Sequence, residues 1–553
     1  MKRIVNTLIY STVFLIPLLF CKNLYNYYEI KFYFLSFTVL LILAFSVKME
    51  RQIVFKEARL SLLLGFFLCW ILFTSLFCSP AKLISLKYFY QHLVSFIWFL
   101  ILLNFCEPRE KIKIIIYIWV FSSTLACFCG IGQYLLDGIP YSTFGNKNIF
   151  SAFIVLTLPV ITALLFNKKN SVLWCWAVII HLLALAATDS RGALLGGLMG
   201  FFLFLLLVIS RRKIIMGLCL GVSFLLIIVS FQGSLLDVFI SDIRFFIWQG
   251  TWEMIKSSPF LGVGGGLFFL RFSLFCPSDY YFQKVAVDAT RHAHNEFLQI
   301  WAETGIVGLI LFLSVVVFFL YQIMYRVKRE ENREIALLIK GIISGLVALL
   351  VHNLLSMNFR MPTSFIWFYL ILGLVYGCYT KKEVIIPHKR AYWFIFLYFL
   401  LFYFLTFKPL LAQYYFRKGV TMRSEQKLKE AVSCYQKALK WDPSSVRVQY
   451  RLAFTLAALK DYEGAYQLYD QIIRIAPGYA SIFHNIGIVS MRQRKFQEAV
   501  DYFKRGLALN PYDLLSRQAL ISAYTELRRQ KEAKIEVQRF IVCQRFLQGV
   551  KKK

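Results

Sequence analysis

The sequence predicts an all-α protein, in which a polytopic bundle of membrane helices precedes an α-solenoid of short helical repeats. Three observations support this prediction. The 553 residues are 59% hydrophobic and 18% aromatic, and a soluble chain of this length would need more polar surface. Apolar runs of about 20 residues, enough to cross a bilayer as a helix, recur as far as residue 408. From about residue 412 the chain becomes polar and repeats with a period of 34 residues.

About 13 apolar runs are long enough to span a membrane. The first follows Lys2 and Arg3 and lacks a small-residue cleavage site, so we expect an uncleaved membrane helix rather than a removed signal peptide. The runs lie near residues 5–21, 29–46, 60–78, 84–105, 113–136, 148–166, 171–187, 192–210, 214–231, 305–325, 335–355, 362–379 and 391–408.

The loops between these runs predict the orientation of the bundle. Counting from the basic N-terminus, every second loop carries at least two lysines or arginines, as cytoplasmic loops do. The other loops carry fewer, and the longest covers about residues 232–304. An odd number of spans places these loops and the C-terminal region on the outer face. Membrane topology and contacts with anionic lipids also explain the net charge of +32, so nucleic acid is not expected as a partner.

The polar C-terminal region has a regular pattern of small, aromatic and proline residues. An alanine recurs every 34 residues, an aromatic residue follows four positions later, and a proline comes near the end of each unit. This pattern resembles the tetratricopeptide repeat, so we expect residues 1–410 to form the membrane domain and residues 411–553 a repeat domain. Such arrays dock a partner protein in a concave groove. The residues are Ala431, Ala465, Ala499 and Ala533, then Tyr435, Tyr469 and Phe503, then Pro443, Pro477 and Pro511.

Polar and cationic residues gather in the loops expected on the outer face. A single arginine at a helix end is usually an interfacial anchor, but several at one boundary indicate an anion site. The planar guanidinium suits phosphate, so a lipid phosphate or diphosphate is the expected ligand. No aspartate pair suited to Mg²⁺ is evident there, so we expect no metal and no cofactor. The candidates are Asn146, Asn148, Arg191, Arg244, Trp248, Arg291, His292, His294, Asn295 and Arg360.

The stretch "HNEFLQIWAETGIVG" carries the clearest resemblance to a known family. Its His294, Asn295, Gly305 and Gly308 fit the pattern of the O-antigen ligase superfamily, which also includes O-antigen polymerases and bacterial O-oligosaccharyltransferases. Four further segments are similar to segments of that family. They are "STFGNKNIFSAF" with Asn146 and Asn148, "TDSRGALLG" with Arg191, "RFFIW" with Arg244 and Trp248, and "MNFRMP" with Arg360. One departure is the segment after His352, which lacks an expected aspartate.

The resemblance implies transfer of a preassembled glycan from an undecaprenyl-diphosphate carrier to an acceptor hydroxyl of a lipid core or a protein Ser or Thr. It implies a metal-independent glycosyltransferase in the bacterial inner membrane, with its site and repeats on the periplasmic side. Arg191 and Arg244 would hold the diphosphate, and His294 would act as the base. The other candidates would bind substrate.

Two other functions remain open. A polymerase would lengthen a lipid-linked glycan by the same chemistry. A transporter or flippase with a protein-binding repeat domain would place charged residues near the bilayer midplane, whereas here they gather at one face.

Overall fold

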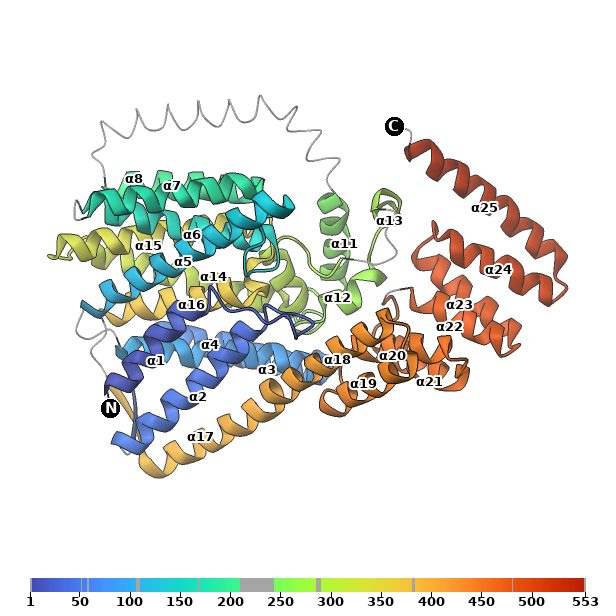
Figure 1. Cartoon of the computed structure of the whole chain (residues 1–553), viewed down its shortest axis with the longest axis horizontal. Helices are drawn as coiled ribbons and strands as arrows, with labels where there is room; N and C mark the ends of the chain where they lie inside the picture. Colours follow the sequence, from blue (N-terminus) through green and yellow to red (C-terminus); the bar gives the residue numbers. More distant parts are fainter. Residues whose placement is uncertain are drawn as a thin grey trace.

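The computed structural model describes residues 2–50, 52–56, 59–105, 110–167, 170–208, 243–284, 290–379, 383–479 and 481–551. It shows a bundle of long antiparallel helices followed by a curved array of helix pairs (Figure 1). The predicted all-α class is confirmed, with one small addition. Two short strands, β1 (Gln52–Lys56) and β2 (Glu383–Pro387), pair antiparallel with Gln52 opposite Pro387.

Within the described residues, ten helices are long and apolar enough to cross a membrane, and two shorter apolar helices, α1 and α16, accompany them. The expected span near 214–231 lies outside the described residues. The bundle helices are α1 (Lys2–Leu15), α2 (Ile30–Glu50), α3 (Arg59–Phe73), α4 (Lys82–Phe105), α5 (Glu110–Asp137), α6 (Lys147–Phe166), α7 (Ser171–Thr188), α8 (Arg191–Val208), α14 (Glu296–Val327), α15 (Arg333–His352), α16 (Pro362–Gly377) and α17 (His388–Phe402).

Helix α15 lies at the centre of the second half of the bundle, packed against α6 and α8. Small residues make this packing close, as is common between membrane helices. A Cβ atom on Gly345 would lie 2.1 Å from the Leu156 carbonyl oxygen, and one on Gly200 would lie 2.7 Å from the Ser344 carbonyl oxygen. The three backbones therefore approach too closely for larger side chains at these positions.

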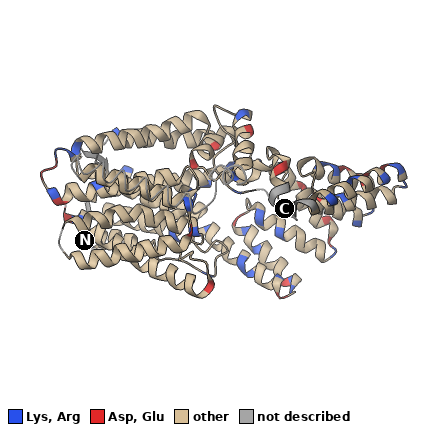
Figure 2. Ribbon diagram, turned by 90° about the horizontal axis from the view of Figure 1, so that it is seen from above, with Lys and Arg blue, Asp and Glu red and all other residues tan. Residues whose placement is uncertain are grey.

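The described loops separate into two groups at opposite ends of the bundle, as the alternation of basic loops predicts. At one end β1 pairs with β2, and Lys113 forms an ion pair with Glu334 (2.8 Å). At the other end the backbone amide of Glu296 donates to the Asn353 carbonyl (2.9 Å). Charged residues lie mainly at these two ends and over the repeats (Figure 2).

The segment before α14 forms a small helical layer over the second end. Its helices are α11 (Ile243–Ser257), α12 (Phe268–Arg271) and α13 (Ser278–Lys284). Their apolar residues form a separate core that includes Ile247, Met254 and Phe272. This layer covers the start of α14, so it encloses part of the rim of the bundle.

The last bundle helix continues directly into the repeats as one helix over Lys389–Ser424. It contains a π-helical turn at Tyr403–Phe407 and becomes α18 (Lys408–Ser424). The array follows as α19 (Leu428–Trp441), α20 (Val446–Ala458), α21 (Tyr462–Ile475), α22 (Ile482–Arg492), α23 (Phe496–Leu509), α24 (Leu514–Glu526) and α25 (Gln530–Lys551).

The repeat pattern explains how these helices pack. Ala431, Ala465 and Ala499 have no exposed surface, and the aromatic residues four positions later are buried beside them. The ring of Tyr435 lies against Gly419 on the preceding helix, where a Cβ would come within 2.5 Å of it. In the last unit Val537 replaces the aromatic residue and is 40% exposed, which fits a terminal capping repeat.

Candidate active site

The loop that precedes α14 is held in a fixed conformation by its neighbours. Asn295 caps the helix, since its side-chain oxygen accepts hydrogen bonds from the amides of Phe297 (3.0 Å) and Leu298 (3.1 Å). The indole of Trp248 on α11 donates to the Ala293 carbonyl (3.0 Å). Between these two anchors His294 adopts a left-handed backbone conformation with φ 52°, which is uncommon for a residue with a β-carbon. The polar groups of Asn295 and Trp248 therefore position the loop.

The turn between α7 and α8 lies at the same end of the bundle. Asn146 caps α6 by accepting from the Asn148 amide (2.8 Å), and the Asn148 side chain accepts from the Ser190 hydroxyl (3.0 Å). Arg191 is the first residue of α8 and is exposed. The two asparagines thus connect the start of α6 to the residue just before Arg191.

The C-terminal end of α15 connects these two regions. The His352 ring lies against Gly192, so that a Cβ there would come within 2.9 Å of it. Arg244 on α11 is close enough to His352 to interact with it electrostatically. The next residue, Asn353, accepts the hydrogen bond from the Glu296 amide. The structure therefore gathers Arg191, Arg244 and the His294 loop around one helix end.

Arg360 lies in a buried ion network that the sequence analysis missed. Its Nε contacts Glu296 (2.9 Å) and its Nη1 contacts Glu303 (2.6 Å). The Arg360 side chain is 8% exposed, and those of the two glutamates are 2% and 1% exposed. Part of the expected substrate-binding capacity of Arg360 is thus used within the protein. Glu296, Gln299 and Glu303 recur on one helical face, and this spacing in an apolar segment was the available signal.

Gln299 connects the ion network to the histidine loop. Its amide group donates to Glu303 (3.3 Å), and its side-chain oxygen accepts from the Ala293 amide (3.1 Å). The same amide nitrogen lies 3.5 Å from Nδ1 of His292. Burial lowers the pKa of His292 to about 3, and the nearby charges of Arg360, His294 and Arg291 act in the same direction. His292 is therefore a neutral imidazole at physiological pH.

Gly305 of the family motif marks a break inside α14. Its backbone has φ 71° and ψ 178°, so the helix is interrupted there. The turns that follow α11 fill the gap, because Val263 donates to the Ala302 carbonyl (2.9 Å) and Ile306 donates to the Pro259 carbonyl (2.9 Å). A Cβ on Gly305 would lie 1.9 Å from the Phe260 carbonyl oxygen. Glycine is required here because the backbones touch.

Lys31 is a second residue that the sequence analysis missed. It has no exposed surface, and its ammonium donates to the carbonyl of Pro17 (3.1 Å) and the hydroxyl of Thr143 (3.3 Å). It also lies 4.0 Å from the centre of the Phe144 ring. This lysine ties the loop between α1 and α2 to the segment before α6, and no pattern in the sequence separates it from the other lysines.

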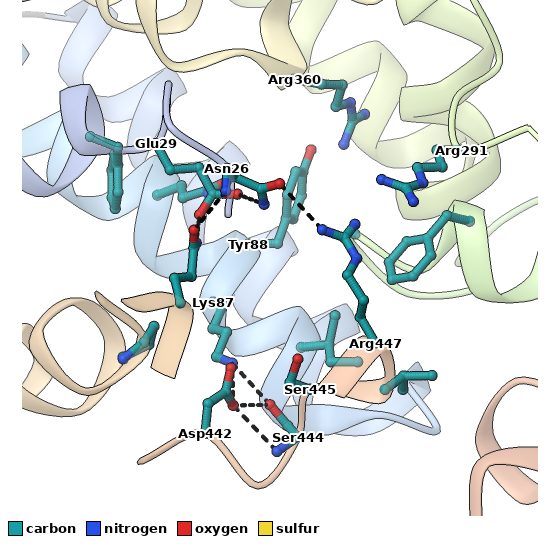
Figure 3. A pocket seen from close by; sticks show the side chains of 18 of the residues that line it. Asn26, Glu29, Lys87, Tyr88, Arg291, Arg360, Asp442, Ser444, Ser445 and Arg447 are labelled. Carbon is teal, nitrogen blue, oxygen red and sulfur yellow. Dashed lines mark hydrogen bonds and ion pairs between the residues drawn. The ribbon is translucent and has the colours of Figure 1, made fainter. Parts of the chain in front are cut away.

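A cavity of about 390 Å³ opens between the bundle and the first repeat. Arg291, Arg360 and Arg447 point into it from three sides, with Tyr88 behind them (Figure 3). His292 also lines it. Arg291 therefore faces this cavity together with His292 and Arg360.

The donors of this region suit an anion. In the part of the chain that the structure describes, no group of three or more His, Cys, Asp or Glu side chains is placed to hold a metal ion. The groups that converge here are instead guanidinium and imidazole, and both are planar. The guanidinium of arginine binds phosphate or carboxylate oxygens through two parallel hydrogen bonds.

Comparison with known proteins agrees with this architecture. Residues 176–313 match the O-antigen ligase family, and residues 422–484 and 480–513 match the tetratricopeptide repeat. The chain is thus a glycan-related, multi-pass membrane protein with an O-antigen ligase segment and a tetratricopeptide repeat region, which confirms both resemblances. The matched ligase segment contains Arg191, Arg244 and His294.

Individual relatives are more distant. The chain is similar to the teichuronic acid biosynthesis protein TuaE of Bacillus subtilis (strain 168), with 20% identity over 335 residues, or 53% of this chain and 67% of that protein. It is 33% identical over 94 residues to the type IV pilus assembly protein PilF of Pseudomonas aeruginosa, which covers 17% of this chain and 37% of PilF. A solved structure of MamA from Desulfovibrio magneticus RS-1 is 16% identical, covers 28% of this chain and 88% of that chain, and has a TM-score of 0.24.

Proposed function

We propose that the protein transfers a preassembled glycan from an undecaprenyl-diphosphate carrier to an acceptor hydroxyl, on a lipid core or on a protein Ser or Thr. In this proposal residues 1–410 form the transferase domain in the bacterial inner membrane, and residues 411–553 form a repeat domain on the periplasmic side. The observation that carries it is the gathering of Arg191, Arg244 and the His294 loop around the end of α15.

The proposed reaction is a single displacement at the anomeric carbon. The acceptor oxygen attacks that carbon while His294 takes the hydroxyl proton. The bond from the anomeric carbon to the diphosphate oxygen breaks, and the lipid diphosphate leaves with the electron pair. Arg191 and Arg244 neutralise the charge that develops on it, so no general acid is needed for this leaving group. Attack opposite the leaving group inverts the anomeric configuration.

Positioning residues support this chemistry. Trp248 and Asn295 hold the backbone on either side of His294. Asn148 holds the turn before Arg191, and Asn146 caps the start of the helix that carries Asn148. The aspartate expected after His352 is missing. The carboxylates at this end that the structure describes include Glu296 and Glu303, and both contact Arg360.

The test uses the full-length purified protein with an undecaprenyl-diphosphate oligosaccharide and a candidate acceptor. His294→Ala should abolish transfer while the protein stays inserted and monodisperse. Arg191→Lys should reduce kcat at least about tenfold, because a point charge cannot replace a bidentate fork on diphosphate. Arg329→Lys, at the opposite end of the bundle and stacked on Tyr325, is the matched control. Normal transfer by His294→Ala would refute the assignment of the base.

A polymerase is the second candidate, because the curated relative aligned over 53% of the chain is named for teichuronic acid biosynthesis. It would use the same site with a second lipid-linked glycan as acceptor. Product length distinguishes the two functions: a ladder of longer lipid-linked chains favours a polymerase, whereas a single added glycan on a different acceptor favours a ligase or oligosaccharyltransferase.

A further inference from the structure

Four cationic side chains line the cavity beside the active site, Lys87, Arg291, Arg360 and Arg447, together with three carboxylates, Glu29, Glu303 and Asp442. Its lining acids are all engaged. Asp442 pairs with Lys87 (2.7 Å), Glu303 pairs with Arg360, and Glu29 accepts hydrogen bonds from Asn26, Tyr33 and Gln413. Among the described residues, no carboxylate lies within ion-pair distance of Arg291 or Arg447.

One buried donor points to a ligand in particular. Nη2 of Arg360 is buried and has no hydrogen-bond partner among the described residues, and the guanidinium faces the cavity (Figure 3). Glu296 and Glu303 match the charge of this guanidinium, but a buried N–H donor is costly when nothing accepts from it. An acceptor oxygen of a ligand in the cavity would satisfy it.

The two remaining arginines belong to different parts of the molecule. Arg447 lies in the first turn of α20, where its Nη1 donates to Asn26 (3.2 Å) and its guanidinium lies 4.9 Å from the centre of the Tyr25 ring. Arg291 precedes the histidine loop. Burial raises the pKa of Tyr28 to about 12, and Arg447 and Arg291 are both close enough to oppose this rise. The two guanidinium groups therefore approach the same tyrosine from the repeats and from the bundle.

A second hollow of about 420 Å³ continues from this cavity along the inner face of the repeats. The two share Tyr25, Arg291 and Arg447 as lining residues. We call the pair the interdomain groove. Its repeat section adds Arg451, Tyr450, Tyr479, Ser481, His484, Asn485, Asp513 and Leu515. Asp513 is engaged as the cap of α24, where it accepts from the amides of Leu515 and Ser516.

We propose that the interdomain groove binds an anionic oligosaccharide, with a carboxylate or phosphate of its sugars held among Arg291, Arg360 and Arg447. This proposal rests on the proposed function, since it names the class of glycan that reaches the site through the repeats.

The lining of the repeat section favours a saccharide over a peptide. A groove that docks a peptide needs apolar pockets for anchoring side chains, yet Leu515 is the single aliphatic residue in the described lining of the repeat section. Tyrosine rings and planar polar groups predominate instead. Tyr450 and Tyr479 meet edge to face at 5.5 Å, and Asn485 donates to the Tyr450 hydroxyl (2.8 Å). Such rings offer faces to the C–H surfaces of sugars, and the arginines select acidic ones.

The groove also reaches the loop that carries the proposed base, His294. His292 lines the bundle section of the groove and is close enough to His294 to interact with it electrostatically. A chain lying along the repeats would thus bring its end beside the proposed base.

The experiment measures binding of a fluorescent oligogalacturonate to the full-length protein in lipid nanodiscs. A phosphorylated maltodextrin distinguishes phosphate from carboxylate recognition, unmodified maltodextrin tests the need for charge, and an oligoglutamate peptide tests the peptide alternative. Arg447→Gln tests the proposed anion site. Arg451→Gln tests the repeat section of the groove and leaves the domain contact intact, because the Arg451 side chain makes no hydrogen bond to the described part of the bundle. Arg474→Gln is the matched control, since Arg474 is 77% exposed and pairs with Asp470 outside the groove.

We expect either acidic saccharide to bind in a salt-sensitive manner, with affinity about tenfold lower in each groove variant and unchanged in Arg474→Gln. Equal binding of unmodified maltodextrin, tighter binding of oligoglutamate, or unchanged binding in the Arg447→Gln/Arg451→Gln double variant would each overturn the proposal. His294→Ala should bind as the wild type does. Its binding reports on the groove and its transfer activity reports on the reaction, so the two proposals fail separately.

Discussion

Removing the charge of Arg360 should loosen the start of α14 without unfolding the whole bundle. Arg360→Gln leaves Glu296 and Glu303 facing each other with side chains 2% and 1% exposed. Breaking a buried ion pair by removing one partner costs about 3–5 kcal/mol. Part of this cost would appear as local opening, because Glu303 accepts from the Phe268 amide (3.3 Å) and the Gln299 side chain (3.3 Å).

The assay is amide hydrogen exchange followed by mass spectrometry of peptides covering residues 264–304. A cost of 3–5 kcal/mol corresponds to faster exchange by roughly two to three and a half powers of ten in the segments that open locally. The triple variant Glu296→Gln/Glu303→Gln/Arg360→Met removes all three charges and should recover most of the protection, because neutral replacements of similar size avoid the unpaired carboxylates. Unchanged exchange in Arg360→Gln would refute the idea that this network holds the histidine loop.

Three further outcomes follow from the geometry. Gly305→Ala should abolish stable expression, because its Cβ would lie 1.9 Å from the Phe260 carbonyl oxygen at φ +71°; normal yield on size-exclusion chromatography would contradict this. The pKa of His292 is lowered to about 3, so between about pH 3 and about pH 6.5 the folded state binds fewer protons than the unfolded state. The free energy of unfolding therefore falls as the pH is lowered through this range, by up to about 1.4 kcal/mol per pH unit. His292→Gln should flatten the pH dependence of thermal stability from pH 4 to pH 6, and an identical profile would argue against an enclosed neutral imidazole. Transfer should persist at more than about half its rate in excess EDTA if arginines alone neutralise the diphosphate, whereas loss of turnover that Mg²⁺ restores would contradict the arginine-only mechanism.

Hydropathy predicted most of the bundle because its helices follow the length and composition that a bilayer imposes. The predicted helix boundaries differed most from the structure where polar residues pair inside the protein. The run expected at 305–325 is the second part of α14, which begins at Glu296. The first turns of α14 were not included in the predicted span, because in the sequence Glu296 and Glu303 look like solvent-exposed charges. Their partner Arg360 lies 64 and 57 residues further along the chain.

The site was predictable to the extent that topology alone brings loops together. Counting spans placed Arg191, Arg244 and His294 at one end of the bundle, and the described loops meet there. Their roles in the reaction stay predictions. The interdomain groove could not be anticipated, because it depends on how the first repeat lies against the end of the bundle. The Lys87–Asp442 and Arg447–Asn26 contacts fix that arrangement, and each joins residues more than 350 positions apart.

The unbroken helix over Lys389–Ser424 has a mechanical consequence. With 36 residues and a rise of about 1.5 Å each, it is roughly 54 Å long, and part of it is immersed in lipid while the rest carries the repeats. A tilt of roughly 5° about the Lys389 end of the helix would displace its Ser424 end by roughly 5 Å. A bilayer whose thickness does not match the helix changes its tilt. Such a change would alter the width of the interdomain groove, and the π-helical turn at Tyr403–Phe407 is where bending is easiest.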